Sequence, residues 1–215
     1  GAAARHLPGL LLLPPPGPNS RGDRFTLKVS AGSYADRVVI DGKTWPDPDL
    51  TNVTIVGEGE VVLNPAGADP VIRLQNTVGV QLTNLRIQGQ GQAVTVELAE
   101  GVDRCALSKL QVSGFTQTGL LLSGALASSF TADRLLIDQV TFQGTAQAVC
   151  LRGMKGKLPD SVDCQNIVIQ KCRFLGPLVT GISVAGADVR GWEVRECSFS
   201  QAECGVEFQA GAGWY

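Results

Sequence analysis

The stretch NIVIQKCRFLGPLVTGISV, residues 166–184, decides the fold. Its apolar side chains fall into three pairs whose members are two positions apart: Ile167 and Ile169, Cys172 and Phe174, and Ile182 and Val184. A helix would repeat its apolar positions every three or four residues, whereas alternation over a few residues is typical of a strand. The stretch therefore predicts three short strands joined by turns.

The same pattern recurs along the chain. Apolar residues lie seven, five and two positions before Phe174, and the same offsets hold before four further anchor residues: Ile87, Val112, Phe142 and Phe199. One more apolar pair follows each anchor: Val94 and Val96, Leu120 and Leu122, Val149 and Leu151, Ile182 and Val184, and Val206 and Phe208. The anchors are 25, 30, 32 and 25 residues apart, so the unit accepts insertions while its internal spacing is kept.

A repeat of this kind predicts a solenoid. No unit can cover its own apolar face, so successive units must stack as coils about 4.8 Å apart, with each strand paired in parallel to its equivalents above and below. We therefore predict an all-β fold, a single-stranded parallel β-helix with three short strands per coil and about seven coils.

Residues 25–210 resemble the right-handed parallel β-helix proteins of the pectin lyase-like superfamily. The segment FTLKVSAGSYADRVVIDG is similar to the first coil of that superfamily, with its Gly-x-Tyr-x-acidic-x-Val-x-Ile pattern present as Gly32, Tyr34, Asp36, Val38 and Ile40. The segment NVTIVGEGEVVL, residues 52–63, would form the next coil. The resemblance implies the fold more strongly than an activity, because enzymes and non-enzymes share this scaffold.

Two regions are expected in the chain. Residues 1–24 are rich in Pro and Gly and are predicted to be a linker or the remnant of a preceding segment, and residues 25–215 are predicted to be the β-helix domain. No polar or helical segment covers the last repeat, so we expect further coils or another domain of the same polypeptide to follow Tyr215. The apolar run 10–13 is shorter than the roughly 20 residues that span a bilayer, so no membrane insertion is expected.

Charge and metal-ligand content exclude several partners. A net charge of −2 and an isoelectric point near 5.4 provide no basic surface for nucleic acid or an anionic membrane. The single histidine, His6, lies outside the repeats, and the six cysteines form no Cys-x-x-Cys pair. We therefore expect no metal and no cofactor.

The strand after each anchor corresponds to the floor of the superfamily's substrate cleft, and alternation gives its outward residues. They are Thr95, Glu97, Leu121, Ser123, Cys150, Arg152, Ser183, Glu207 and Gln209. Glu97 and Glu207 are four coils apart, on the order of 19 Å, whereas a glycosidase holds its two carboxyl groups roughly 5–10 Å apart. These two residues are therefore not predicted to be an acid and base pair.

Arg152 is the only basic residue in this outward set, so it would be the base if the chain were a lyase of the superfamily. Calcium would be expected only with such a lyase-like site, and the neighbouring positions offer no carboxylate to bind it. The superfamily's pectin methylesterases carry Gln-Asp, Asp-Phe and Arg-Pro-Trp segments on this face, and its polygalacturonases carry a His-Gly segment. None of these segments occurs in the chain.

Asp103-Arg104 and Asp133-Arg134 occupy equivalent positions in adjacent repeats. Stacking would place their backbones about 5 Å apart. Two stacked carboxylates could share a proton or bind a cation, whereas crossed ion pairs with the arginines would only stabilise the corner. The presence of both arginines favours the ion pairs.

The two longer units carry their extra residues in segments 123–134 and 152–166. Both loops are expected on one edge of the solenoid, and long loops on a rigid scaffold commonly bind ligands. The second loop contains the candidate binding residues Arg152, Lys155, Lys157 and Asp160, which join those of the two corners. This rim could meet an acidic sugar or a protein; a tolerated surface insertion is the alternative.

The cysteines fall into two groups by their position. Cys172 and Cys197 stack inside the solenoid and are expected to be free thiols that pack as small apolar groups. Cys150 points outward and Cys164 follows in the loop, so this is the pair that we expect to be bridged or reactive.

These observations favour a non-catalytic β-helix module of a larger surface or envelope protein, extracellular or in the cell envelope. It would bind glycan or protein through its polar face and its two loops. One alternative is a fragment of a polysaccharide-active enzyme, a uronate polysaccharide lyase before a glycoside hydrolase or pectin esterase. The other is a structural spacer without a ligand.

Overall fold

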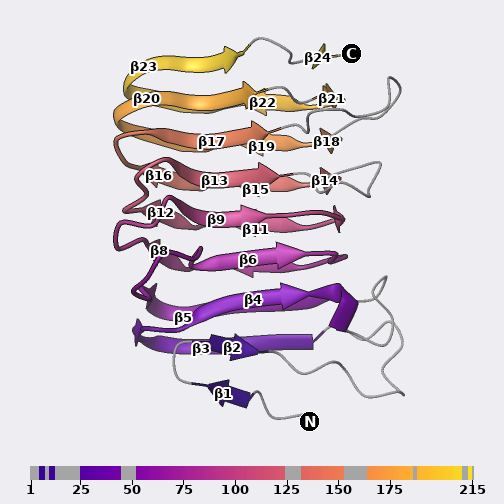
Figure 1. The fold of residues 1–215 in the computed structure, drawn as a ribbon, viewed down its shortest axis with the longest axis vertical. Coiled ribbons are helices and arrows are strands. Elements are labelled where there is room, and N and C mark those ends of the chain that lie inside the picture. Colours follow the sequence, from indigo (N-terminus) through magenta and orange to yellow (C-terminus); the bar gives the residue numbers. More distant parts are fainter. Residues whose placement is uncertain are drawn as a thin grey trace.

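The computed structural model describes residues 5–7, 10–12, 25–44, 52–123, 132–152, 164–185, 188–209 and 213–214. In these residues the regular structure is all strand, apart from the short 3₁₀ turn η1 (Gly42–Thr44). Successive coils lie one above another along the long axis (Figure 1). No described helix is long and apolar enough to cross a membrane.

Three columns of parallel strands run along the solenoid. The first column contains β7 (Gln81–Thr83), β11 (Ala106–Ser108), β15 (Leu136–Asp138), β19 (Val168–Gln170) and β22 (Glu193–Arg195). The second contains β8 (Arg86–Gln88), β12 (Gln111–Ser113), β16 (Thr141–Gln143) and the first parts of β20 (Arg173–Ala185) and β23 (Ser198–Phe208). The third contains β4 (Arg37–Asp41), β6 (Ile72–Gln75), β9 (Val94–Leu98), β13 (Thr118–Ser123), β17 (Gln147–Arg152) and the later parts of β20 and β23.

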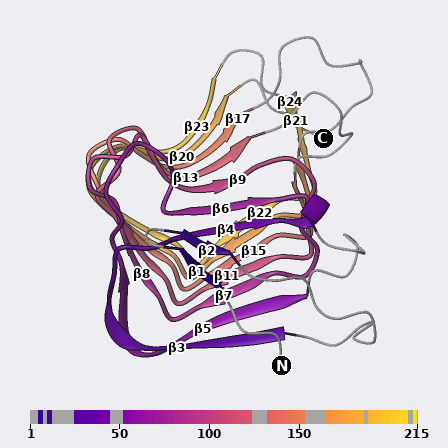
Figure 2. The ribbon, with the colours of Figure 1, turned by 60° about the horizontal axis from the view of Figure 1, so that its bottom comes forward.

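The remaining strands extend this plan at a corner and at the N-terminal end. A small parallel sheet at the corner before the first column contains β10 (Val102–Asp103), β14 (Ala132–Asp133), β18 (Cys164–Gln165), β21 (Asp188–Arg190) and β24 (Gly213–Trp214). At the N-terminal end, β3 (Phe25–Tyr34) and β5 (Val53–Leu63) run through the first and second columns without a break. Figure 2, an oblique view in which the N-terminal end comes forward, shows the coils one behind another.

The described part of the chain shows about five turns of this plan, slightly fewer than the seven coils predicted. Within the segment 1–24, β1 (Arg5–Leu7) and β2 (Leu10–Leu12) form an antiparallel pair, and β2 pairs in parallel with β4. The predicted all-β parallel solenoid is confirmed.

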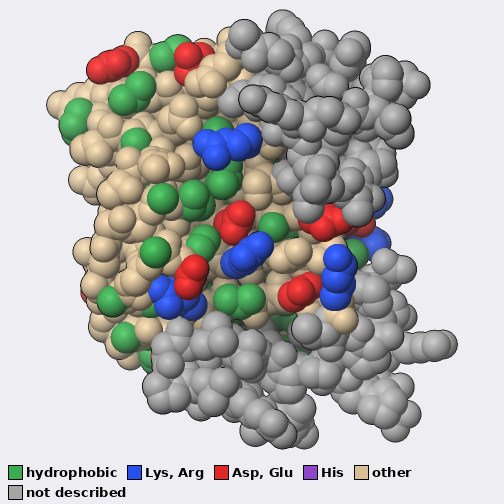
Figure 3. Space-filling model, viewed as in Figure 1, with side chains coloured by type: hydrophobic (Ala, Val, Ile, Leu, Met, Phe, Trp, Pro, Cys, Tyr) green, Lys and Arg blue, Asp and Glu red, His purple; other side chains and the backbone are tan. Residues whose placement is uncertain are grey.

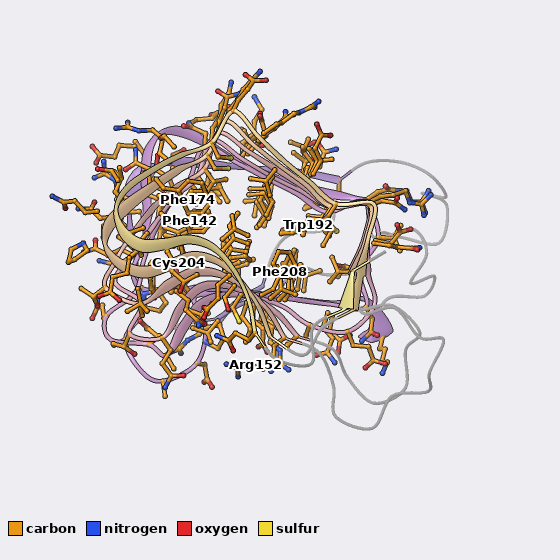
Figure 4. The ribbon with its side chains drawn as sticks, turned by 90° about the horizontal axis from the view of Figure 1, so that it is seen from above. Phe142, Arg152, Phe174, Trp192, Cys204 and Phe208 are labelled. Atoms are coloured by element: carbon orange, nitrogen blue, oxygen red, sulfur yellow. The ribbon has the colours of Figure 1, made fainter. Side chains whose placement is uncertain are left out.

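The pairing register follows the anchor residues of the repeat. Ile87 pairs with Val112, Val112 with Phe142, Phe142 with Phe174, and Phe174 with Phe199. The rings of Phe142 and Phe174 are stacked with centroids 5.4 Å apart, and those of Phe174 and Phe199 with centroids 4.6 Å apart. Figure 4 shows Phe142 and Phe174 one above the other inside the coil. Like residues therefore lie over like residues along the core, as the repeat predicts.

A single residue turns the chain between the first and second columns. In successive coils this residue is Asn84, Lys109, Gln139, Lys171 and Glu196, and each has a positive φ between 53° and 57°. The left-handed conformation is rare outside glycine and asparagine. The backbone N–H of Asn84 donates to the carbonyl oxygen of Ser108 in the next coil, and its side-chain Nδ2 donates to that of Gly57. The bend between the columns is thus tied to both neighbouring coils.

Candidate functional site

Several outward side chains of the third column are buried, although alternation alone would place them in solvent. Thr95, Leu121, Cys150 and Ser183 point away from the core but are only 0%, 6%, 1% and 0% exposed. Leu121, Cys150 and Ser183 are paired in register across successive coils, so a line of small and apolar side chains runs along this face. Arg152 projects from the outside of the coil, whereas Phe174 and Phe208 point into the interior (Figure 4).

Four polar residues cross this face and form what we call the charged strip: Arg73, Glu97, Ser123 and Arg152. Arg73 Nε lies 3.4 Å from Glu97 Oε2, and Ser123 Oγ donates to Glu97 Oε1 at 3.0 Å. Arg152 is exposed and is paired in register with Ser123 of the preceding coil. Figure 3 shows this face, on which basic and acidic side chains lie side by side among apolar ones.

Sequence reasoning missed Arg73. It lies on β6, and the coil that contains β6 does not keep the offsets of the repeat. A signal was present, because Ile72 and Leu74 alternate with Arg73 and pair in register with Val96 and Leu98. Arg73 therefore occupies the same outward row as Glu97.

Cys150 has a free thiol, so the predicted bridge between Cys150 and Cys164 is wrong. Its outward direction is as predicted, but its side chain is only 1% exposed. Burial raises the pKa of the Cys150 thiol, while the positive charge and hydrogen bond of Arg152 act in the opposite direction. A buried thiol that stays protonated is a packing residue and not a nucleophile.

Glu207, the second carboxylate of this face, is far from Glu97. The row Glu97, Leu121, Cys150, Ser183, Glu207 is continuous in register, so the two carboxylates are four coils apart. Glu207 accepts hydrogen bonds from Thr180 Oγ1 at 3.2 Å and from Gln209 Nε2 at 3.3 Å. Glu97 and Glu207 are therefore too far apart to act as acid and base on the same glycosidic bond, as predicted.

Of the two corner carboxylates, Asp103 forms ion pairs with both arginines, whereas the side chain of Asp133 lies outside the described part of the structure. Asp103 and Asp133 are in register on β10 and β14. Arg134 Nη2 lies 2.9 Å from Asp103 Oδ1, and Arg104 Nε lies 3.0 Å from Asp103 Oδ2. Two guanidinium groups thus neutralise the charge of Asp103, and both of its carboxylate oxygens are in contact with an arginine.

The second inserted loop is only partly described. Arg152 ends β17, whereas Lys155, Lys157 and Asp160 lie outside the described residues. Among the described residues, no group of three or more His, Cys, Asp or Glu is placed to hold a metal ion. That the whole chain takes no metal or cofactor stays a prediction.

Comparisons with known proteins identify the fold. No model of a known protein family matches the sequence, and no curated protein sequence matches it. A candidate glycosyl hydrolase from Parabacteroides merdae ATCC 43184 is similar in structure, with a TM-score of 0.57 and 12% identity over 82% of this chain and 81% of that one.

Two pectin methylesterases are less similar. The one from Yersinia enterocolitica has a TM-score of 0.44 and 12% identity over 91% of this chain and 90% of that one. Another, in complex with a hexasaccharide, has a TM-score of 0.47 and 9% identity over 90% of this chain and 84% of that one. The register of the coils and the structural similarity to the candidate glycosyl hydrolase together show that the chain has a parallel β-helix fold.

Proposed function

We propose that the chain is a non-catalytic β-helix module that binds an acidic polysaccharide along the outward face of the third column. The observation that carries this proposal is the charged strip. Its only carboxylate, Glu97, is already held by Arg73 and Ser123, and Arg152 is exposed further along the same face. The strip therefore presents guanidinium groups to a ligand and offers no unoccupied carboxylate.

An acidic polysaccharide suits the spacing of the two arginines. Arg73 is in register with Cys150 three coils away, and Arg152 lies two positions further along the strand of Cys150, so the two arginines are about 14 Å apart along the axis at about 4.8 Å per coil. A guanidinium group binds a carboxylate through two parallel hydrogen bonds. Between the arginines, Leu121 and Cys150 are short or apolar and nearly buried, so an extended sugar chain can lie along this face.

The absence of catalysis is proposed from the positions of the carboxylates. A glycoside hydrolase needs two carboxyl groups roughly 5–10 Å apart, and Glu97 and Glu207 are four coils apart, on the order of 19 Å. A similar structure is a candidate glycosyl hydrolase, which is compatible with a polysaccharide ligand and says nothing about turnover in this chain. Placement in a larger extracellular or envelope protein belongs to the same proposal.

Affinity electrophoresis through gels that contain polygalacturonate or alginate tests this proposal, with gels of neutral dextran as the reference. The wild-type protein should be retarded by the acidic polysaccharides only. Arg152→Gln and Arg73→Gln should each reduce the retardation several-fold, because each removes one charge-assisted contact. Arg195→Gln is the matched control, since Arg195 is an exposed arginine on the first column and should not affect binding.

The rival functions predict different results in the same experiment. A spacer would migrate equally in all gels, and protein binding through the loops would leave both arginine variants like the wild type. Either result contradicts the proposal. If Arg152 were the base of a lyase, the polysaccharide would gain the ultraviolet absorbance of an unsaturated uronate, and Arg152→Gln would abolish it.

A further inference from the structure

A second polar surface lies on the second column, on a different face from the charged strip. Two adjoining shallow cavities of about 270 Å³ and 290 Å³ open there, and both are lined by Arg86 and Gln111. We call the cavity of about 290 Å³, including Arg86 and Gln111 that it shares with the other cavity, the amide groove. Its polar lining residues are Arg86, Gln88, Gln111, Ser113, Thr141 and Gln143.

The amide groove is built by the register of the coils. Gln88, Ser113 and Gln143 are paired in one outward row across β8, β12 and β16, and Arg86, Gln111 and Thr141 form the second row. Neighbouring residues of a row are one coil apart, about 4.8 Å, which is comparable to the length of a sugar ring. The groove therefore repeats hydrogen-bonding groups along the axis of the solenoid.

The charge of the groove is neutralised within the chain. Arg86 Nη1 lies 2.5 Å from Glu60 Oε1, and Arg86 Nε donates to Gln111 Oε1 at 3.1 Å. Because the oxygen of Gln111 faces Arg86, the Gln111 amide nitrogen is left as a donor for a ligand. Lys109 is the remaining charge, and it lines only the neighbouring cavity.

Other hydrogen-bonding groups of the groove have no partner within the described part of the chain. The amides of Gln88 and Gln143 are exposed, and Ser113 and Thr141 are partly exposed. Each glutamine offers a carbonyl acceptor and two N–H donors side by side, and each hydroxyl both donates and accepts. Such a set matches adjacent hydroxyl groups, which also donate and accept.

A peptide strand fits this surface poorly. The backbones of β8, β12 and β16 are already paired to neighbouring coils on both sides, so no strand edge is free for a peptide to extend the sheet. The groove also lacks an aromatic or aliphatic pocket on its outward side. Side-chain hydrogen bonding to a hydroxyl-rich molecule is the recognition that remains.

We propose that the amide groove binds a neutral oligosaccharide that lies along the solenoid axis across successive coils. Gln88, Gln111 and Gln143 provide the main contacts, one from each of three coils. Binding is expected to be weak, in the millimolar range, because each exposed hydrogen bond contributes little net free energy. The site is independent of the charged strip and of the function proposed for it.

Titration of the isotopically labelled chain with cellohexaose, mannohexaose and maltohexaose, followed by NMR, tests the proposal. At least one hexasaccharide should shift the side-chain amide resonances of the wild-type protein in a saturable manner. Gln88→Ala and Gln143→Ala should each weaken binding about three- to tenfold, the effect of losing one or two hydrogen bonds. Both residues are exposed and point away from the core, so the variants should keep their fold, which the backbone spectrum verifies.

Two control variants locate the binding. Gln81→Ala removes an outward glutamine from the first column, and Arg152→Gln alters the charged strip; both should bind the hexasaccharide like the wild type. The proposal is overturned if none of the three hexasaccharides binds, or if Gln88→Ala and Gln143→Ala bind with unchanged affinity. Loss of binding in Arg152→Gln alone would place the sugar on the third column and would equally contradict the proposal.

Discussion

Arg134 holds both carboxylate oxygens of Asp103 across the boundary between two coils. Its Nη2 lies 2.9 Å from Oδ1 and 2.9 Å from Oδ2, and its Nε lies 3.1 Å from Oδ1. The contact joins β10 to the residue that follows β14, so it ties two consecutive units of the repeat at one corner. The pair is thus a structural contact between coils.

Asp103→Asn should lower the free energy of unfolding by about 0.5–1 kcal/mol, because the pair is bidentate but partly exposed. Urea denaturation measures this change, and a double-mutant cycle with Arg134→Gln isolates the pair. The coupling should shrink in high salt, since screening weakens exposed ion pairs. A coupling energy of zero at low salt would show that the contact contributes nothing to stability.

Phe174→Ala should be among the most destabilising single changes. The ring lies between those of Phe142 and Phe199, so its removal opens a cavity in the stack. Loss of a buried phenylalanine typically costs about 3–5 kcal/mol. Val179→Ala, at a side chain that is 48% exposed, is the control and should change stability by no more than about 0.5 kcal/mol. Similar urea midpoints for the two variants would contradict the stacked core.

The inward residues could be predicted from the sequence because stacking requires an apolar residue at the same offset in every coil. Phe142, Phe174 and Phe199 are such a set, and their register is as expected. Arg73 was missed because its coil departs from those offsets. That Arg73 lies beside Glu97 follows only from the pairing of β6 with β9 in the structure.

Exposure on the outward side was harder to predict. Alternation gives the direction of a side chain, but the burial of Cys150 and Ser183 depends on what packs over them. The amide groove was missed for a related reason. Gln88 and Gln143 each resemble an ordinary surface residue in the sequence, and the register alone brings them into one row.

Gly114→Ala should be clearly more destabilising than Gly91→Ala. Both glycines have a positive φ, 75° and 90°, so alanine pays the cost of the left-handed conformation at either position, about 1–2 kcal/mol. A Cβ at Gly114 would also lie 2.0 Å from the carbonyl oxygen of Gly89, whereas one at Gly91 would have no atom within 4 Å. Thermal unfolding measures both variants. Equal losses would mean that the backbones of adjacent coils at Gly89 and Gly114 are not in close contact.

The buried cysteines predict a loss of stability in alkaline solution. Burial raises the pKa of the Cys172 thiol from 9.0 to about 12 and that of Cys105 from 9.0 to about 11. Above pH 9 the unfolded chain releases these protons while the folded chain keeps them, so the free energy of unfolding should fall as the pH rises from about 9 towards 12. Urea midpoints at about pH 8 and about pH 10.5 measure this fall.

Cys172→Ala should flatten that pH dependence, although it also lowers stability at neutral pH by leaving a small cavity. Val179→Ala provides the control, because it changes an exposed side chain that does not ionise and should leave the slope unchanged. A wild-type slope that Cys172→Ala does not alter would show that the Cys172 thiol does not titrate differently in the folded and unfolded chains.

The most direct test of the account is the length of a bound acidic polysaccharide after prolonged incubation with the protein. Polygalacturonate that is retarded by the wild-type chain, and released by Arg152→Gln, should keep its size distribution, its number of reducing ends and its ultraviolet absorbance. Shortened polysaccharide produced by the wild type and not by Arg152→Gln would contradict the account and make this face an active site.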